Sequence, residues 1–170
     1  MTTRGVFVGM ELPQLQTAPI TRKTLALFAG ASGDHQPTHI DIDAAKAKGR
    51  QDVIAHGMLM MAYLGRTLTD WVSQDKIRAY KARFVAMTPV HAVATCQGKV
   101  IALDDGLATV ELSICLADGA TVVKAEAVVD VRESQADASR TATAFAQSLD
   151  SERDPMSETA EIGRASCRER

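Results

Sequence analysis

Residues 56–72 read HGMLMMAYLGRTLTDWV and form the main helical pattern of the chain. Apolar residues recur here at three- and four-residue spacing, as they do along one face of an α-helix. This face comprises Ile54, Met58, Met61, Ala62, Gly65, Leu68 and Val72. Further apolar surface comes from Leu59, Tyr63, Leu64 and Trp71. Because a helix that is apolar on more than one side is normally buried, we expect a sheet to wrap around it.

The chain after this helix has the pattern of β-strands. Apolar and β-branched residues dominate four segments: 77–90, 92–103, 107–116 and 121–131. Asp104-Asp105-Gly106 and Asp118-Gly119 are turn signals that separate the last three of them. A weaker strand is expected near Val6–Met10. One long helix followed by an antiparallel meander predicts an α+β domain, with an antiparallel sheet wrapped around one long central helix.

Alternation within the last two segments indicates which side chains face the helix. In residues 107–116 the inward side chains are Val110, Leu112, Ile114 and Leu116. In residues 121–131 they are Val123, Ala125, Ala127, Val129 and Val131. The polar residues between them, Lys124, Glu126 and Asp130, are expected to point outward.

Two shorter helices are expected before the long one. Thr21 can cap the first, and Gly30 and Gly33 would end it. A loop then covers residues 34–39, and a second short helix spans residues 43–48.

The composition excludes several classes of protein. With 170 residues, 46% hydrophobic and 24% charged, the chain is expected to fold as one ordinary domain. A net charge of −2 and a pI near 6.1 give no basic face for nucleic acid or an anionic membrane. We find no transmembrane or signal segment, so the cytoplasm is the expected compartment. The 3 irregularly spaced cysteines favour neither a disulfide framework nor a metal knuckle.

The folded domain is expected to span residues 1–133. Residues 134–170 are rich in Ser, Thr, Ala and charged residues, which is typical of a disordered tail. The last ten, 161–170, resemble the translated read-through of a sequencing adapter and are left out of the fold prediction as an artefact.

Asp34 and His39 are the first candidates for chemistry. They lie five residues apart across a turn stiffened by Pro37, which forces Gln36 into extended backbone. A carboxylate and an imidazole so placed can hold a water molecule and act on it as a general base. The alternative is an Asp that merely caps the turn and a His on the surface.

Gly57 is the second candidate, because it opens the long helix. Its N–H has no intrahelical partner and lies at the positive end of the helix dipole, where it can bind a carbonyl oxygen that gains negative charge. The alternative is a glycine that only permits close packing.

His56 is interpreted either as structural or as a substrate contact. The spacing of Asp34, His35, His39 and Asp41 does not favour a metal site, and no cofactor is expected.

These residues resemble a known family. The stretch SGDHQPTHID (residues 32–41), Ala45, and IAHGML (residues 54–59) are similar to the signature of MaoC-like dehydratases. This family holds (R)-specific enoyl-CoA hydratases and (3R)-hydroxyacyl-ACP dehydratases of the hotdog fold. The similarity extends over about residues 5–132, including Phe84–Val90.

The resemblance implies a mechanism and a substrate. Asp34 and His39 would activate a water molecule, add it to C3 of a trans-2-enoyl thioester and deliver a proton to C2. The Gly57 amide would bind the thioester oxygen, with Gln36, His56 and Met58 as substrate-binding residues. The family usually has Asn at the position of Gln36. A homodimer, or a heterodimer with a related subunit, is also implied, with acyl-CoA or acyl-ACP as substrate.

Two other functions are considered. A hotdog thioesterase would attack C1 and would not need an Asp and a His in this loop. A non-catalytic acyl-thioester-binding subunit would keep only the fold, yet this chain retains both residues. Acyl chain length would depend on Met60, Met61 and Leu64. A CoA phosphate could be contacted by Arg50, Lys81 or Arg83. The simpler interpretation is that these charges are solvated.

Overall fold

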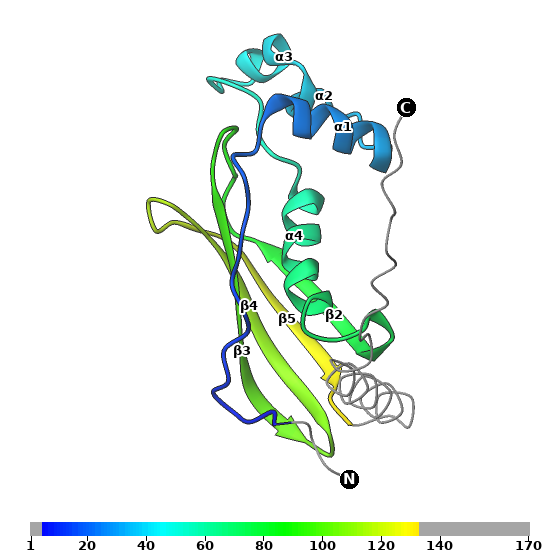
Figure 1. Ribbon diagram of the computed structural model, residues 1–170. Coiled ribbons are helices and arrows are strands. Elements are labelled where there is room, and N and C mark those ends of the chain that lie inside the picture. Colours follow the sequence, from blue (N-terminus) through cyan, green and yellow to red (C-terminus); the bar gives the residue numbers. More distant parts are fainter. Residues whose placement is uncertain (1–4, 133–170) are drawn as a thin grey trace, which may run out of the picture. The chain divides into compact units, whose positions relative to one another are not determined.

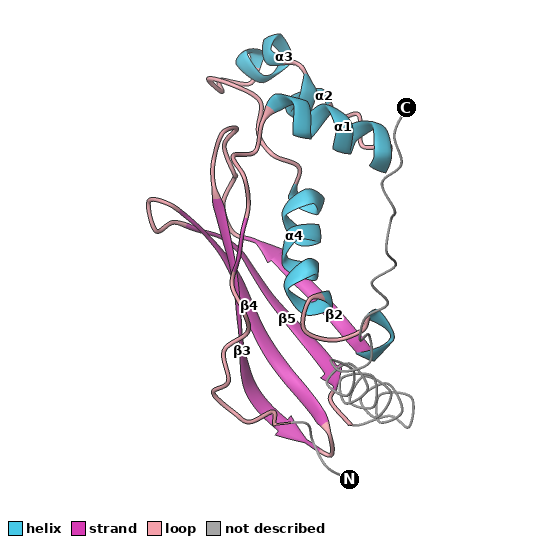
Figure 2. Ribbon diagram, viewed as in Figure 1, coloured by secondary structure: helices cyan, strands magenta, loops and turns pink. Residues whose placement is uncertain are grey.

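Residues 5–132 are described by a computed structural model, and the tail expected at 134–170 lies outside them. The elements in chain order are β1 (Leu15–Gln16), α1 (Arg22–Ser32), α2 (Pro37–Ile40), α3 (Ile42–Ala47), α4 (Gly57–Thr69), the 3-10 turn η1 (Gln74–Lys76), β2 (Ile77–Phe84), β3 (Ala94–Asp104), β4 (Leu107–Leu116) and β5 (Thr121–Asp130). The strands form one antiparallel sheet in the order β1-β3-β4-β5-β2, and α4 runs along one face of it (Figures 1 and 2). The predicted α+β architecture is confirmed.

The meander β3-β4-β5 begins with a tight hairpin. Asp105 and Gly106 have φ angles of 42° and 74°, the left-handed pair that matches the twist of the flanking strands. A Cβ atom at Gly106 would lie 2.3 Å from Cγ of Arg132, so the Arg132 stem fills the space beside this turn. The Val131 N–H also donates to the Gly106 carbonyl oxygen at 2.9 Å. The end of β5 is therefore fastened onto the hairpin.

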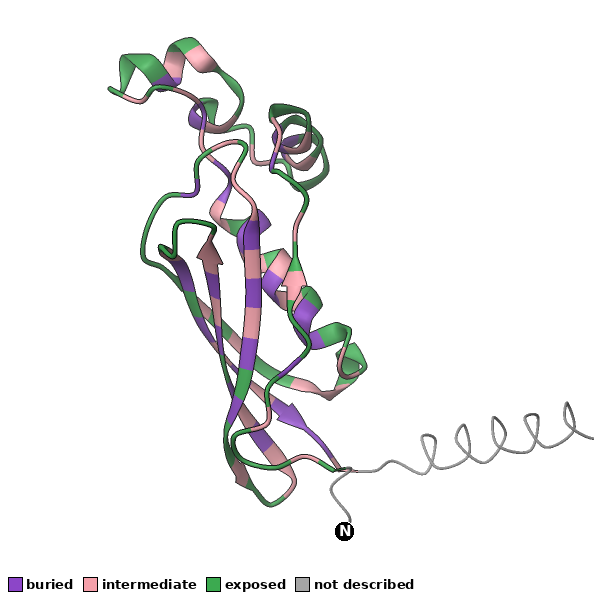
Figure 3. Ribbon diagram, turned by 60° about the vertical axis from the view of Figure 1, so that its left-hand side comes forward, coloured by how far each residue is buried: buried purple, intermediate pink, exposed green. Residues whose placement is uncertain are grey.

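Burial alternates as predicted along β4 and the middle of β5 (Figure 3). Val110, Ile114 and Val129 have no exposed surface and pack into one apolar core with α4. Of the face predicted for the long helix, however, only Leu68 is buried. The buried residues of α4 are Leu59, Met60, Leu64, Thr67 and Leu68. Met58, which was expected on the buried face, is 56% exposed. The helix is apolar on two sides, and the sheet packs against the side that carries the leucines.

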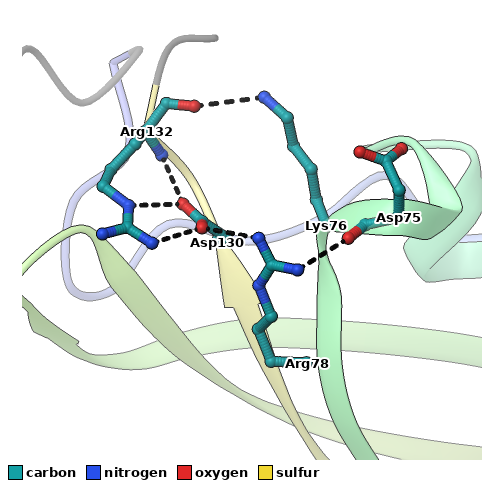
Figure 4. Close-up of polar contacts among 5 residues, drawn as sticks. All are labelled: Asp75, Lys76, Arg78, Asp130 and Arg132. Carbon is teal, nitrogen blue, oxygen red and sulfur yellow. Dashed lines mark hydrogen bonds and ion pairs between the residues drawn. The ribbon is translucent and has the colours of Figure 1, made fainter.

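Asp130 was expected to point to solvent, but its side chain is buried. Arg132 donates to it from Nε at 2.8 Å and Nη2 at 2.5 Å, and Arg78 donates from Nη2 at 2.8 Å. Figure 4 shows both guanidinium groups converging on this carboxylate, which we call the Asp130 cluster (Asp130, Arg78, Arg132). Bonds from Arg132 and then Arg78 hold the pKa of the Asp130 carboxyl well below its usual range.

Polar side chains and backbone turns begin and end the first helices. The Thr21 Oγ1 accepts a hydrogen bond from the Thr24 N–H at 3.1 Å, as predicted for the start of α1. The helix continues through Gly30 and ends at Gly33, whose φ of 73° is left-handed. Asp41 caps α3 by accepting from two backbone N–H groups.

Three predicted boundaries were wrong. Residues 6–10 form a turn at Gly9 instead of a strand, and the edge strand β1 lies further along the chain. The region 34–39, predicted as a loop, contains the start of the helix α2. β2 ends at Phe84 rather than continuing to Val90, because the N–H groups of Val85 and Ala86 both turn to the Val122 carbonyl.

Candidate active site

Asp34 directly follows the left-handed Gly33 that ends α1. Its Oδ1 accepts a hydrogen bond from the Gln36 N–H at 3.2 Å, which fixes the carboxylate in the turn. The turn-capping interpretation is thus correct for one carboxylate oxygen. The side chain is only partly buried, and Oδ2 stands outside this bond, so the second oxygen can meet another donor.

His39 lies in α2, which Pro37 opens at its first position. The His39 Nδ1 is 2.8 Å from the carbonyl oxygen of Ile54. Since a carbonyl oxygen only accepts, Nδ1 carries the proton, and in the neutral ring Nε2 then carries the lone pair. The ring is partly exposed. His39 is therefore oriented as a base, with its proton-accepting nitrogen turned away from Ile54.

His56 connects these two residues. Its ring is stacked on His39 with centroids 4.1 Å apart, and its Nε2 lies 3.2 Å from the backbone oxygen of Asp34. The edge of the ring meets Phe28, with centroids 5.0 Å apart. His56 has no exposed surface, and its Nδ1 has no hydrogen-bond partner among residues 5–132. Burial lowers the His56 pKa, with a smaller contribution from neighbouring His39, so the ring is held neutral.

Asp34, His39 and His56 form a histidine cluster, whose ligand atoms all lie within 4.8 Å of one another. Two acceptors at this separation can be bridged by one water molecule, since each hydrogen bond to water measures about 2.8 Å. Of the residues that the structure describes, these three could also ligate a divalent transition metal. Metal ligation and water activation would draw on the same three side chains.

Gly57 begins α4 immediately after His56. The first hydrogen bond at this end of the helix runs from the Met60 N–H to the His56 oxygen at 3.3 Å, which leaves the Gly57 N–H at the open end of the helix. A Cβ atom at Gly57 would lie 3.3 Å from the ring of Phe84. The glycine thus brings a helix N-terminus close to the end of β2.

A pocket of about 220 Å³ is lined by both His39 and Gly57, whereas Asp34 and His56 do not belong to its lining. Its lining comprises His39, Ile54, Ala55, Gly57, Met60, Phe84, Ala86, Met87, Thr88 and Val123. The chain after β2 is held here because the Ala55 N–H donates to the Thr88 oxygen at 2.9 Å. Sequence reasoning missed the side chains that this segment supplies, Phe84, Met87 and Thr88. The signals for them were the strand-like run that ends at Pro89 and the family resemblance, which extends over Phe84–Val90.

The remaining predicted residues are not all near the pocket. Met60 lines it, whereas Leu64 is buried further along α4. Gln36 and Met58 are exposed and do not belong to the lining. Their roles as substrate contacts, like that of His56, stay predictions.

The three cations considered for a phosphate also differ. Lys81 is paired with Glu126 at 2.6 Å, and Arg83 is exposed on β2. Arg50 is partly buried and reaches Met87, with 3.9 Å between Nη2 and Sδ.

Within residues 5–132, we find no helix with the length and apolar character needed to cross a membrane.

Comparison with known proteins gives consistent matches. The 3-hydroxyacyl-thioester dehydratase Z of Mycobacterium tuberculosis is 29% identical over 113 residues, covering 62% of this chain and 75% of that protein.

Two solved structures are similar along nearly their whole length. The ChsH1-ChsH2 complex from Mycobacterium tuberculosis matches with a TM-score of 0.67 at 28% identity, covering 74% of this chain and 98% of that chain. The (R)-hydratase from A. caviae involved in PHA biosynthesis matches with a TM-score of 0.67 at 26% identity, covering 76% of this chain and 99% of that chain. These likenesses confirm the expected hotdog fold. The family model described as MaoC like domain matches residues 6–110, more than half of the chain, and the chain therefore belongs to the MaoC-like dehydratase family.

Proposed function

We propose that the chain adds water to trans-2-enoyl thioesters with (R) stereochemistry, and that it catalyses the reverse dehydration of (3R)-3-hydroxyacyl thioesters. One observation carries this proposal. Asp34, His39 and His56 each offer one ligand atom within 4.8 Å of the others, the His39 Nδ1 is bonded to the Ile54 oxygen, and His39 shares a pocket with the N-terminus of α4 at Gly57. A base and an oxyanion donor thus line the same small pocket.

The reaction follows from these positions. The Asp34 carboxylate accepts one hydrogen of the water molecule and fixes its direction, while the His39 Nε2 takes the other proton. The water oxygen then bonds to C3, and the π electrons move through C2 to the carbonyl oxygen. The Gly57 N–H binds that enolate oxygen, a contact worth roughly 2.7–4 kcal/mol in the transition state. His39 returns the proton to C2, so that one water has been added and the base is regenerated.

The neutral state of His56 supports this sequence of steps. Its Nε2–H bonds to the Asp34 backbone and its ring supports the face of His39. Were His56 charged, a cation would lie against His39 and would disfavour the protonated form that His39 must adopt during the reaction. Burial keeps that charge away.

A second chain is part of the proposal. β2 is an edge of the sheet, and large apolar side chains at its end and beside it are exposed: Phe84 47%, Val85 43%, Met87 61% and Met58 56%. Phe84 and Met87 also line the pocket, so this apolar rim lies beside it and would be covered in a dimer. The partner is a second copy or, as in the ChsH1-ChsH2 complex that this chain resembles, a related subunit.

The direct test is hydration of crotonyl-CoA by the full chain. We expect loss of enoyl absorbance and formation of (R)-3-hydroxybutyryl-CoA, identified by chiral chromatography. Release of free thiol without hydration would instead establish a thioesterase. Tight binding of crotonyl-CoA with neither reaction would establish a non-catalytic binding subunit, or a chain that needs its related partner. Addition of a related subunit distinguishes these last two.

A further inference from the structure

Arg50 lies at the edge of the pocket. It follows the left-handed Gly49, and its backbone N–H turns back to the Ala45 oxygen at 3.1 Å, which fixes the start of the side chain at the end of α3. The side chain then crosses to Met87, where Nη2 lies 3.9 Å from Sδ. Met87 is a wall of the pocket and is 61% exposed, so the guanidinium lies where the pocket meets solvent.

The charge of Arg50 is not balanced within the part of the chain that the structure describes. Arg22 pairs with Asp52, and Arg78 and Arg132 pair with Asp130. Arg50 has no carboxylate among residues 5–132, and its Nε–H is buried without a hydrogen-bond partner. Burying an unpaired N–H of a cation is costly, since it loses water and gains nothing in return. An anion bound by the terminal N–H groups of Arg50 would balance the charge of the guanidinium.

We propose that Arg50 binds the phosphate that ends the pantetheine arm of the thioester substrate. This inference rests on the proposed function, because CoA and acyl carrier protein both attach the acyl group through such an arm. The arm separates the phosphate from the thioester, so its cation must lie outside the reacting centre, as Arg50 does. A guanidinium offers a planar pair of donors that match two phosphate oxygens. Arg50 is a binding residue here and has no part in moving protons.

The experiment compares substrates with and without phosphate. Crotonyl-CoA carries it, whereas the crotonyl thioester of N-acetylcysteamine does not. For Arg50→Met we expect KM for crotonyl-CoA to rise roughly tenfold, as for loss of a charge-assisted hydrogen bond, with kcat little changed. KM and kcat for the N-acetylcysteamine thioester should stay within about twofold of the wild type. Arg50→Lys should recover part of the KM, since it keeps the charge but loses the planar donor pair.

The matched control is Lys46→Met, which removes the same charge from an exposed position on α3. It should leave both substrates unaffected. Equal losses of Arg50→Met on both substrates, or a change in oligomeric state or melting temperature, would show that Arg50 supports the loop or the interface and would overturn the proposal. No loss on either substrate would overturn it as well.

Binding without turnover separates this proposal from the proposed function. By calorimetry, the wild type should bind CoA more tightly than pantetheine, and Arg50→Met should abolish the difference, whether or not hydration occurs. A crotonyl thioester of 4′-phosphopantetheine identifies the phosphate. An equal loss on this substrate and on crotonyl-CoA assigns the contact to the phosphate that both carriers share. A loss confined to crotonyl-CoA would place the contact on phosphates that CoA alone carries and would overturn the assignment to the pantetheine phosphate.

Discussion

The histidine cluster and the Asp130 cluster each hold a carboxylate close to basic side chains, but they differ in how completely their polar groups are paired. Asp130 receives bonds from two guanidinium groups, so its oxygens are fully engaged. In the histidine cluster, Asp34 has one oxygen in a turn, His39 has a free Nε2, and His56 has an unpartnered Nδ1.

The difference shows what each cluster can do. A carboxylate whose oxygens are all hydrogen-bonded stabilises the fold and has no lone pair to offer a substrate. A cluster with unpaired acceptors contributes less to stability, yet it retains the acceptors that a reaction needs. Arg50 and the Gly57 N–H also offer hydrogen-bond donors that are not fully paired, and both lie at the same end of the molecule as the histidine cluster. Variants of the two clusters should therefore affect different measurements.

The largest effect is expected for Asp34→Asn, which removes an acceptor for the activating water but keeps the shape. We expect kcat on crotonyl-CoA to fall by about 10²–10⁴-fold, the usual contribution of general base catalysis. The melting temperature should change little, because only one oxygen of Asp34 has a partner. Asp43→Asn, which alters an exposed carboxylate on the neighbouring α3, is the control and should keep full activity. A normal rate for Asp34→Asn would contradict the mechanism.

A smaller loss is expected for Gly57→Ala. The new methyl group would stand 3.3 Å from the Phe84 ring, which must shift and narrow the pocket. We expect kcat/KM to fall roughly tenfold, since sub-ångström displacement of a bound substrate is costly. Gly65→Ala on the same helix is the control, because its Cβ meets Tyr80 at an ordinary 3.6 Å. Equal kinetics of the two variants would show that Phe84 yields freely.

Asp130→Asn should show the opposite pattern. It leaves the guanidinium groups of Arg78 and Arg132 without their carboxylate, so the melting temperature should fall by several degrees while kcat/KM stays near that of the wild type. Asp104→Asn, at an exposed position near the same end of the sheet, should change neither quantity. A loss of activity at temperatures where Asp130→Asn is folded would mean that the two clusters are coupled.

The stabilising effect of Asp130 should depend on pH in one direction. Its pKa is lower in the folded protein than the ordinary value of 3.8, so the unfolded chain binds a proton first as the pH falls. The advantage of the wild type over Asp130→Asn in unfolding free energy should be complete above pH 3.8 and decrease below it. Urea titrations of both proteins across this range measure the effect. A constant difference would mean that the carboxylate is not held in its charged form.

The smallest effect concerns His56. Because burial lowers its pKa below the ordinary 6.5, the unfolded chain takes up a proton there that the folded chain does not. Stability should therefore decline as the pH falls below 6.5, although by little. NMR titration of the imidazole signals should find that His56 protonates below its ordinary pKa of 6.5. Protonation above that value would show that His56 is stabilised as a cation.

Local sequence signals predicted the local structure well. The Asp105-Gly106 hairpin, the Thr21 cap and the bounds of β4 all follow from residue types whose preferences act over a few neighbours. The buried face of α4 could not be predicted in this way, because the periodicity of apolar residues does not distinguish between the two apolar sides of the helix. The choice depends on the sheet, which is made by residues far along the chain. The same reason explains why Asp130 was predicted outward, since one of its partners, Arg78, lies on another strand.

The site was predicted in part. The sequence singled out Asp34, His39 and Gly57, and the structure brings His39 and Gly57 to one pocket and Asp34 beside His39. The spacing could not reveal that His39 stacks on His56, because that contact depends on how α2 and α4 meet. Phe84 and Met87 were missed because apolar residues at the end of a strand look like core until the strand order places them at an edge.

The Arg132 stem beside Gly106 has a practical consequence for protein engineering. Surface hairpins are the usual places to insert a tag or exchange a turn sequence. Here any side chain at position 106 would displace the Arg132 carbons, which lie 2.3 Å from its Cβ, and so pull Arg132 away from Asp130. A sequence inserted at this exposed turn would therefore disrupt the buried contact between Arg132 and Asp130. The hairpin after Leu116, where a Cβ at Gly119 would meet nothing within 4 Å, is the safer site.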